Sequence, residues 1–290
     1  MNHHHFRVPA GKRIRLQDYD PGFTGHFPGE NEVAAKLRQD VEKLAKQQDM
    51  LYAQNRYALL LILQGMDCAG KDGTIRHVMS GVNPQGTQVH SFKAPSVEEL
   101  NHEFLWRSTK VLPERGRVCL FNRSYYEEVL VVRVHPQLLE AQKLPPGTNG
   151  KRLWKDRFHD INAFERHLTR KGTLILKFFL HLSKAEQRRR LLTRIDTPEK
   201  NWKFSPGDVK ERSYWDDYMN AYEDALNHTS TEWAPWYIVP ADHKWFTQTV
   251  VADVIVARLK SLKLSYPRLS AADHRRLMKA RKLLRADAGK

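Results

Sequence analysis

The segment 65–71, GMDCAGK, has the residue types and spacing of a phosphate-binding loop, in which a glycine, four residues, a second glycine and a lysine follow one another. Such a turn directs successive backbone N–H groups at a phosphate, and the N-terminus of the following helix adds positive potential. Gly65 and Gly70 would let the backbone approach the phosphates of a nucleotide, and Lys71 would carry a mobile charge to them. A strand–helix turn that holds these residues by chance is the plainer alternative, but the flanking segments favour phosphate binding.

One position of this loop departs from the usual pattern. Asp72 follows Lys71 at the place where phosphate-binding loops have a Ser or Thr whose hydroxyl contacts magnesium. Two carboxylates are candidates to replace that hydroxyl, Asp67 within the loop and Asp72 itself. We therefore expect a carboxylate rather than a hydroxyl to serve the metal here.

A second group of polar residues follows the apolar segment 117–121, which is predicted to be a strand. Asn122, Arg123 and Glu127 belong to this group. Polar side chains at the carboxyl end of a parallel strand lie where such sheets bind ligands. With Lys71 holding a transferring phosphate, this group and Asp67 would place magnesium and the acceptor. The predicted chemistry is therefore phosphoryl transfer, which depends mostly on positioning and charge neutralisation.

An arginine-rich segment follows the predicted strand 173–180, and its cations include Arg188, Arg190, Arg194 and Lys203. A solvated basic face is the ordinary interpretation of such a run. In nucleotide kinases with this loop, however, the segment after the fourth strand is an arginine-bearing lid. Arginine suits phosphate binding because its donors form a fixed fork. We therefore expect a lid over about 184–210, with Trp202 and Trp215 packing its base.

The elements that must position these residues alternate between strands and helices, which predicts a parallel five-stranded sheet with helices on both faces. Capping-box patterns at Ser96–Glu99 and Ser183–Glu186 mark two helix starts. The predicted strands are 57–63, 88–92, 117–121, 173–180 and 236–239, and the predicted helices are 30–54, 74–79, 96–106, 154–168, a segment from 184, 215–226, 245–262 and 270–285.

Three parts of the chain are expected. Residues 1–30 are rich in glycine and proline and predict an extended arm that is ordered where Phe6, Phe23 or Phe27 docks. Residues 31–265 would form one catalytic domain that includes the lid and a loop at 135–151. Residues 266–290 would form a basic C-terminal helix with no evident place in the core.

The charge balance constrains the partners of the protein. The net charge is +15 at pH 7 and the pI is about 9.8, which implies a polyanionic partner such as nucleic acid, polyphosphate, nucleotides or an anionic membrane surface. No apolar run approaches the length of a membrane span, and the first residues lack a signal-peptide core. The two cysteines, Cys68 and Cys119, do not make a disulfide framework. A cytoplasmic protein without membrane association is the expectation.

Taken together, five stretches resemble the polyphosphate kinase 2 family of polyphosphate-dependent nucleotide phosphotransferases. The resemblance covers nearly all of 30–265 and is far more specific than the phosphate loop alone. The stretches are GMDCAGKDGTI (65–75), VNPQGTQVHSFKAP (82–95), FNRSYYEEVLVVRVH (121–135), EQRRRLLTRIDTPEKNWKFSPGD (186–208) and STEWAPWYIVPADHKWF (230–246).

The resemblance implies a thymidylate kinase-like P-loop fold and transfer of the terminal phosphate of inorganic polyphosphate to AMP or ADP, with ATP as a product. Mg²⁺ is the implied cofactor, with Mn²⁺ as an alternative. The implied catalytic residues are Asp67, Lys71, Asn122, Arg123 and Glu127, of which Asp67, Asn122 and Glu127 would bind the metal. The implied polyphosphate ligands are Lys71, Arg190, Arg194 and Lys203, with Arg188 as a weaker transfer, and the implied nucleotide ligands are Gly65, Gly70, Arg123 and Arg133.

Three residues of these sets carry further expectations. Many family members have Asp where this chain has Asn122, and Asn followed by a Tyr–Glu pair looks like the subgroup called class III, which accepts both AMP and ADP. Glu127 would then be the compensating carboxylate. Arg133 is expected either to contact the acceptor phosphate or to form a salt bridge. Because the family often assembles into dimers or tetramers, a homo-oligomer is also expected.

Two other functions stay open at this point. An ATP-dependent nucleoside monophosphate kinase would share the loop and the lid, but it does not require so basic a surface. A nucleic-acid-binding protein with a degenerate loop would suit the net charge, but the sequence contains no recognised nucleic-acid module. The preferred base, the preference between AMP and ADP and the net direction of the reaction are not decided by the sequence.

Overall fold

The sheet at the centre of the molecule is parallel throughout and five-stranded, as the alternation of strands and helices predicted. The computed structural model describes residues 1–25, 27, 29–148 and 150–287. The strand order is β2-β3-β1-β4-β5, and the strands are β1 (Ala58–Gln64), β2 (Thr87–Ser91), β3 (Val118–Asn122), β4 (Thr173–His181) and β5 (Trp236–Pro240).

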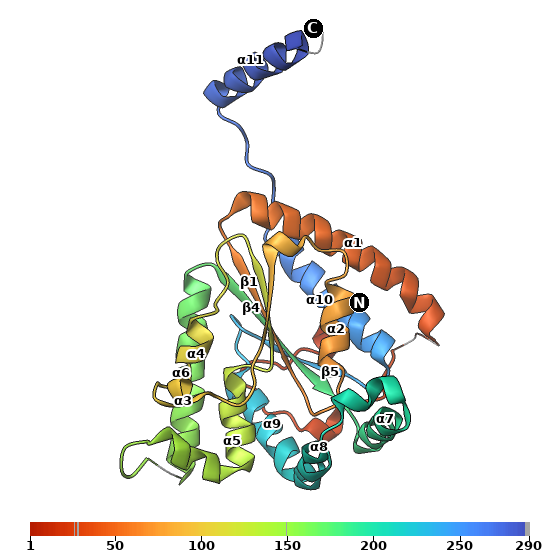
Figure 1. The fold of residues 1–290 in the computed structure, drawn as a ribbon, viewed down its shortest axis with the longest axis vertical. Helices are drawn as coiled ribbons and strands as arrows, with labels where there is room; N and C mark the ends of the chain where they lie inside the picture. Colours follow the sequence, from red (N-terminus) through yellow and green to blue (C-terminus); the bar gives the residue numbers. More distant parts are fainter. Residues whose placement is uncertain (26, 28, 149, 288–290) are drawn as a thin grey trace.

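Helices cover both faces of this sheet (Figure 1). The α-helices are α1 (Glu30–Gln54), α2 (Lys71–Val78), α3 (Val97–Leu100), α4 (Trp106–Thr109), α5 (Val131–Val134), α6 (Gly150–Arg170), α7 (Lys184–Asp196), α8 (Pro206–Glu211), α9 (Trp215–Thr229), α10 (Lys244–Ser261) and α11 (Ala271–Asp287). Short 3-10 helices lie between them, η1 (His3–His5), η2 (Leu16–Asp18), η3 (Pro84–Gly86), η4 (Tyr125–Val129), η5 (Pro136–Gln142), η6 (Pro198–Lys203) and η7 (Arg212–Tyr214).

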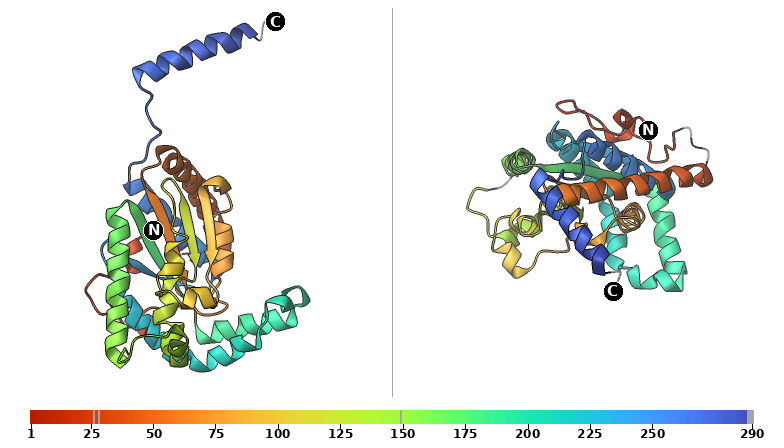
Figure 2. Two further views of the ribbon diagram at one scale, coloured as in Figure 1. Left: turned by 60° about the vertical axis from the view of Figure 1, so that its left-hand side comes forward. Right: turned by 90° about the horizontal axis from the view of Figure 1, so that it is seen from above.

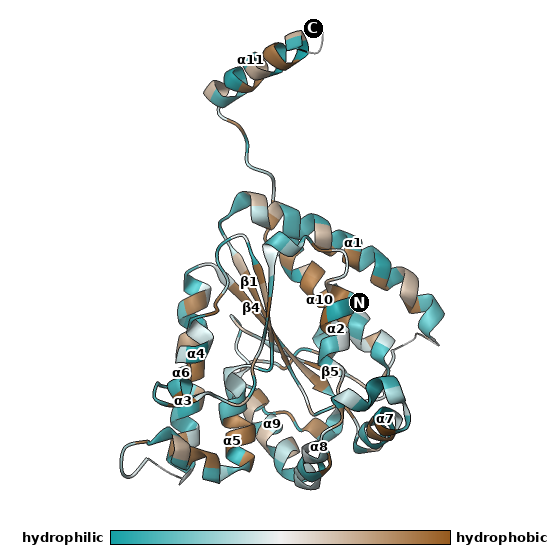
Figure 3. Cartoon of the chain, in the orientation of Figure 1, coloured by the Kyte–Doolittle hydropathy of each residue, from teal (hydrophilic) through white to brown (hydrophobic). Residues whose placement is uncertain are grey.

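Two hydrophobic cores lie on the two sides of the sheet because successive side chains of a strand point to opposite faces. In β1, Leu59 and Leu61 enter the core that is completed by α1 and α10, whereas Leu60 and Ile62 enter the core completed by α6 and α9. Every residue of β1 is buried, as expected for a central parallel strand. Coloured by hydropathy, the strands at the centre are among the most apolar segments (Figure 3).

The N-terminal arm lies along the edge of β5. Val8 donates its backbone N–H to the Trp236 carbonyl at 2.9 Å, and Ile238 donates to the Phe6 carbonyl at 2.8 Å. Phe6 and Val8 are 3% and 1% exposed, so the arm contributes to the core rather than only covering it. The predicted docking of Phe6 is therefore what the structure shows. The arm prediction also included residues 26 and 28, which lie outside the described residues.

Several predicted boundaries were wrong. The helix expected over 96–106 is divided into α3 and α4, because a turn at 101–105 interrupts it, where Glu103 accepts a hydrogen bond from the Leu105 N–H. The loop expected over 135–151 contains η5, and α6 begins at Gly150, ahead of the apolar pattern that marked it. Position 149 of that loop lies outside the described residues.

The two predicted capping boxes differ in outcome. The one at Ser96–Glu99 is complete, with both reciprocal hydrogen bonds present. At α7, Ser183 accepts a hydrogen bond from the Glu186 N–H, but the Glu186 carboxylate binds Arg189 and Arg190 instead of returning to the helix start. The competing guanidinium groups one turn later account for the difference.

The C-terminal helix α11 stands away from the rest of the chain in Figure 1 and in the left view of Figure 2. None of its described residues is buried. Of the basic helix predicted over 266–290, the described part is α11, which begins at Ala271 and ends at Asp287, and positions 288–290 lie outside the described residues. Among the described residues, no helix combines the length and the apolar character that crossing a membrane requires.

We expect truncation of Phe6 to destabilise the fold. Its ring is 3% exposed and packs against Phe246 with the ring centroids 6.1 Å apart. Phe6→Ala should lower the free energy of unfolding by about 3 kcal/mol, because it removes a buried ring and leaves a cavity. Val97→Ala is the control, since Val97 is 78% exposed, and should change it by less than about 0.5 kcal/mol. Equal, small effects in denaturant titrations would show that the arm is not part of the core.

Candidate active site

The predicted site residues meet because β1 and β3 are parallel neighbours. Leu63 in β1 is paired with Asn122 in β3, so the segments that follow the two strands leave the sheet at the same edge. The Arg123 N–H donates to the Leu63 carbonyl at 3.0 Å and continues this pairing by one residue. The loop 65–71 and the segment 122–128 are thereby brought together, as the sequence predicted.

The backbone of the phosphate loop depends on both of its glycines. A Cβ atom at Gly65 would lie 2.9 Å from the Leu180 carbonyl oxygen of β4, so the close approach of these strands excludes a side chain. Gly70 has φ +99°, in the region that favours glycine, and it accepts the first hydrogen bond of α2 from the Thr74 N–H. The loop therefore has a defined conformation that ends at a helix N-terminus.

Lys71 turns back over this loop. Its Nζ donates to the Gly65 carbonyl at 2.7 Å and to the Met66 carbonyl at 3.2 Å, and the residue is 9% exposed. Burial, and then the nearby Arg123 guanidinium, lowers the pKa of Lys71. The ammonium group thus sits in an environment that disfavours its charge, which an anion bound in the loop would relieve.

Arg123 joins the loop to η4. Its Nη2 is 2.9 Å from Asp67 Oδ1, and its Nη1 is 3.7 Å from Glu127 Oε2. Arg123 itself adopts a left-handed conformation, with φ 61°. Gln64, at the end of β1, donates to Glu127 Oε1 at 3.0 Å. Burial raises the pKa of Glu127, while Arg123 acts in the opposite direction.

Asn122 contacts Asp72, the residue that replaces the usual hydroxyl. The Asn122 Nδ2 donates to Asp72 Oδ1 at 2.6 Å. Because the amide nitrogen of Asn122 binds Asp72, the amide oxygen is the atom of this side chain that could serve as a metal ligand. Among the described residues, no three His, Cys, Asp or Glu side chains form a group that could hold a metal by themselves.

The base of the predicted lid is tied to the phosphate loop by Arg190. This arginine is 7% exposed, and it donates to the carbonyls of Cys68, Ala241 and Asp242 at 2.9, 2.6 and 2.9 Å. Its Nε also binds Glu186 at 2.7 Å. In this conformation Arg190 connects α7, the loop and the end of β5, instead of projecting from the lid.

The other predicted lid cations differ in their contacts. Arg194 binds Asp208 at 2.8 Å and the Lys203 carbonyl at 3.1 Å, which joins α7 to α8. Arg188 and Lys203 are exposed. Trp202 is 78% exposed, so the prediction that it packs the base of the lid was wrong. Trp215 is 8% exposed and belongs to the hydrophobic core that α6 and α9 complete, so its packing against the lid stays a prediction.

Arg133 forms the salt bridge that was one of its two expected roles. It pairs with Asp224 of α9 and lies over the Trp154 ring, with its Cζ 6.0 Å from the ring centroid. Neither partner belongs to the group around Arg123. Contact between Arg133 and a nucleotide stays a prediction.

A sequence model of the family Polyphosphate kinase 2 matches residues 29–267. The chain belongs to the polyphosphate kinase 2 family. It is 54% identical over 280 residues to an ADP-polyphosphate phosphotransferase from Rhodopseudomonas palustris, covering 96% of this chain and 97% of that protein. It is 44% identical over 274 residues to an AMP/ADP-polyphosphate phosphotransferase from Meiothermus ruber, covering 93% and 97%.

A solved structure agrees with these relatives. The crystal structure of polyphosphate kinase 2 from Arthrobacter aurescens TC1 superposes with a TM-score of 0.85 at 41% sequence identity, covering 95% of each chain. The family resemblance and the P-loop kinase-like fold expected from it are therefore confirmed.

Sequence reasoning missed three polar residues of this candidate site. Gln64 holds Glu127, Gln187 donates to the Asp67 carbonyl at 3.0 Å, and Asp208 receives Arg194. Burial, and then the negative charge of Asp67, raises the pKa of Asp208. A polar residue at the end of an apolar strand was the available signal for Gln64, whereas the other two depend on how the lid folds back.

Replacing Lys71 by Met should leave the substrate-free fold at least as stable. A lysine whose folded pKa is lowered makes an unfavourable contribution at neutral pH, because its charged form is favoured in the unfolded chain. Lys71→Met should keep Tm unchanged or raise it in thermal unfolding at pH 7. Lys177→Met is the contrasting control and should lower Tm. Burial lowers the pKa of Lys177 as well, but its loss leaves the buried Glu165 carboxylate without its ion-pair partner. A fall of more than about 4 °C for Lys71→Met would contradict this account.

Proposed function

We propose that this protein is a polyphosphate-dependent nucleotide kinase that transfers the terminal phosphate of inorganic polyphosphate to AMP and ADP, forming ATP reversibly. The observation that carries the proposal is the meeting of a phosphate loop, the group around Arg123 and a basic lid at one edge of the sheet, in a chain of this family. Relatives named for ADP and for AMP/ADP as acceptors support this substrate class.

The reaction exchanges one P–O bond for another. An oxygen of the acceptor's terminal phosphate forms a bond to the terminal phosphorus of polyphosphate, and the bridging P–O bond breaks so that the shortened polyphosphate leaves. Lys71 would exchange its contacts with the Gly65 and Met66 carbonyls for oxygens of the transferring phosphate. Arg123 would face the charge that the phosphoryl group develops, held there by Asp67 and Glu127.

The donors of the site suit Mg²⁺, with Mn²⁺ as an alternative. Mg²⁺ is typically bound by one or two carboxylates together with substrate phosphates rather than by a cage made only of protein. Asp67 and Glu127 offer carboxylates and Asn122 an amide oxygen, which fits that requirement without a third carboxylate. Held by these side chains, the ion would neutralise negative charge on the phosphate groups.

A comparison of donors tests this function. The protein should form ATP from ADP, and ADP from AMP, with polyphosphate as the donor, and Lys71→Ala should lower turnover on the order of 100-fold or more. Nucleotide products resolved by chromatography are the measurement. Phosphorylation of AMP with ATP but not with polyphosphate would instead identify a nucleoside monophosphate kinase.

The exposed lid cations should make polyphosphate binding depend on salt. When a protein neutralises several phosphates, counterions are released, so its apparent affinity for the polyanion falls as salt concentration rises. This direction of change is known for nucleic acids, and we expect the same for polyphosphate. Replacing Arg188 and Lys203 by Gln should flatten the rise of the polyphosphate KM with ionic strength. Lys151 and Arg152 at the exposed start of α6 provide the control, because the same substitution there removes equal charge outside the lid.

In that comparison, the nucleotide KM is the internal reference. It should respond less to salt than the polyphosphate KM in the unsubstituted protein. Identical salt dependence for the lid variant, the α6 variant and the unsubstituted protein would show that the lid does not bind the donor. Cytoplasmic location and a homo-oligomeric state stay predictions, which fractionation and light scattering would test.

A further inference from the structure

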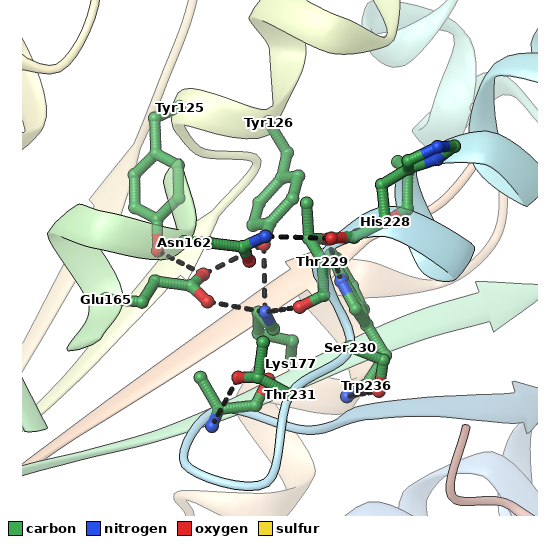
Figure 4. Close-up of polar contacts among 12 residues, drawn as sticks. Tyr125, Tyr126, Asn162, Glu165, Lys177, His228, Thr229, Ser230, Thr231 and Trp236 are labelled. Carbon is green, nitrogen blue, oxygen red and sulfur yellow. Dashed lines mark hydrogen bonds and ion pairs between the residues drawn. The ribbon is translucent and has the colours of Figure 1, made fainter. Parts of the chain in front are cut away.

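A buried ion pair, Lys177 with Glu165, contacts two tyrosines of η4. Lys177, in the middle of β4, is fully buried. Its Nζ donates to Glu165 Oε2 at 2.6 Å, to the Thr229 carbonyl at 2.7 Å and to the Tyr126 hydroxyl at 2.9 Å (Figure 4). All three donors of the ammonium group are thereby satisfied inside the protein.

Glu165 extends this contact to two consecutive residues of η4. Its Oε1 accepts from the Tyr125 hydroxyl at 2.8 Å and from the Tyr126 hydroxyl at 2.9 Å, as the converging dashed lines in Figure 4 show. Both tyrosine rings are buried, at 3% and 0% exposed. Because these residues lie between Arg123 and Glu127 in the sequence, fixing their hydroxyls restricts the short backbone that carries both site residues.

A second buried ion pair holds the other side of Glu127. Arg157 Nη1 lies 2.7 Å from Glu128 Oε1, and the two residues are 4% and 9% exposed. Gln142 connects them, accepting from Arg157 at 2.8 Å and donating to Glu128 at 2.8 Å. Arg157 and Glu165 both belong to the buried side of α6. α6 therefore contacts η4 through residues on both sides of Glu127 in the sequence, Tyr125 and Tyr126 before it and Glu128 after it.

Stability alone does not explain these pairs. Removing two charges from water is costly, and replacing a buried ion pair by well-packed apolar residues is often neutral or stabilising. What a set of buried polar contacts adds is a defined geometry, because alternative positions would leave more buried groups without partners, as Arg157 Nε already is. Here the element with the defined geometry is η4, and Glu127 turns from it toward Gln64 and Arg123.

We propose that Glu165, Lys177 and Arg157 are positioning residues for phosphoryl transfer, which act through Tyr125, Tyr126 and Glu128 to place Glu127 and Arg123. This inference rests on the proposed function, because its kinetic test measures phosphate transfer from polyphosphate. The contacts of Glu165, Lys177 and Arg157 are with other protein groups behind the proposed site residues. Their effect should therefore appear in the rate of the chemical step and not in the binding of polyphosphate or nucleotide.

The test removes the two tyrosine hydroxyls and keeps the rings. Tyr125→Phe/Tyr126→Phe should lower kcat by about 10- to 100-fold, as expected for a small misplacement of reacting groups. The KM values for polyphosphate and ADP should change by less than about twofold, because no binding contact is lost. Lys36→Met is the control for lost stability, since it opens an internal ion pair with Asp40 and Asp253 between α1 and α10, and it should leave kcat unchanged.

A double-mutant cycle identifies the group being positioned. In a Glu127→Gln background, the two tyrosine substitutions should lower kcat by a smaller factor than in the unsubstituted protein, because one of the two side chains that they place is already lost. Full additivity of the two effects, or a fall in kcat matched by Lys36→Met at equal loss of Tm, would overturn the inference.

A crystal structure of the tyrosine double variant separates this inference from the proposed function. We expect the contact between Gln64 and Glu127 to be broken or displaced in it. An unchanged contact would overturn the positioning role whatever the activity. If the unsubstituted protein transfers no phosphate from polyphosphate, the proposed function fails, and the position of Glu127 in this variant still decides the inference.

Discussion

The guanidinium of Arg123 connects the two halves of the site, and the arrangement of the other groups depends on it. It binds Asp67 of the phosphate loop on one side and faces Glu127 of η4 on the other. Each carboxylate alone would be a partly buried negative charge beside the phosphate site. Because one guanidinium offsets the charge of both carboxylates, Asp67 and Glu127 would repel a nearby phosphate less. The lowered pKa of Lys71 means that a bound anion would stabilise its charged form.

A second arginine has the complementary role at the base of the lid. Arg190 holds the Cys68 carbonyl of the loop and two carbonyls after β5, and Gln187 holds the Asp67 carbonyl. The first turns of α7 are thus attached to the loop, so the loop is supported from the lid as well as from β3. If the lid binds polyphosphate as proposed, its closing would involve the chain beyond these contacts, where Arg194 and Asp208 join α7 to α8.

Local patterns predicted the sheet, the phosphate loop and the meeting of Asp67, Lys71, Asn122, Arg123 and Glu127, because a parallel sheet places successive strand ends at one edge. They failed where contacts are long-range. A run of arginines does not reveal that Arg190 is buried among carbonyls, and an isolated Trp202 does not reveal its exposure. The partners of Lys177 and Glu165 were equally hidden, since an apolar strand and an amphipathic helix give no sign that their polar residues meet.

The most direct test of this account compares Arg123→Lys with Arg123→Met in single-turnover transfer from polyphosphate to ADP. Lysine keeps the charge but lacks the two nitrogens that contact Asp67 and Glu127 at once. The account predicts that both variants stay folded and both lose transfer on the order of 100-fold or more. Near-normal transfer by Arg123→Lys would contradict it, because a positive charge alone would then suffice and the bridge between loop and η4 would not be needed.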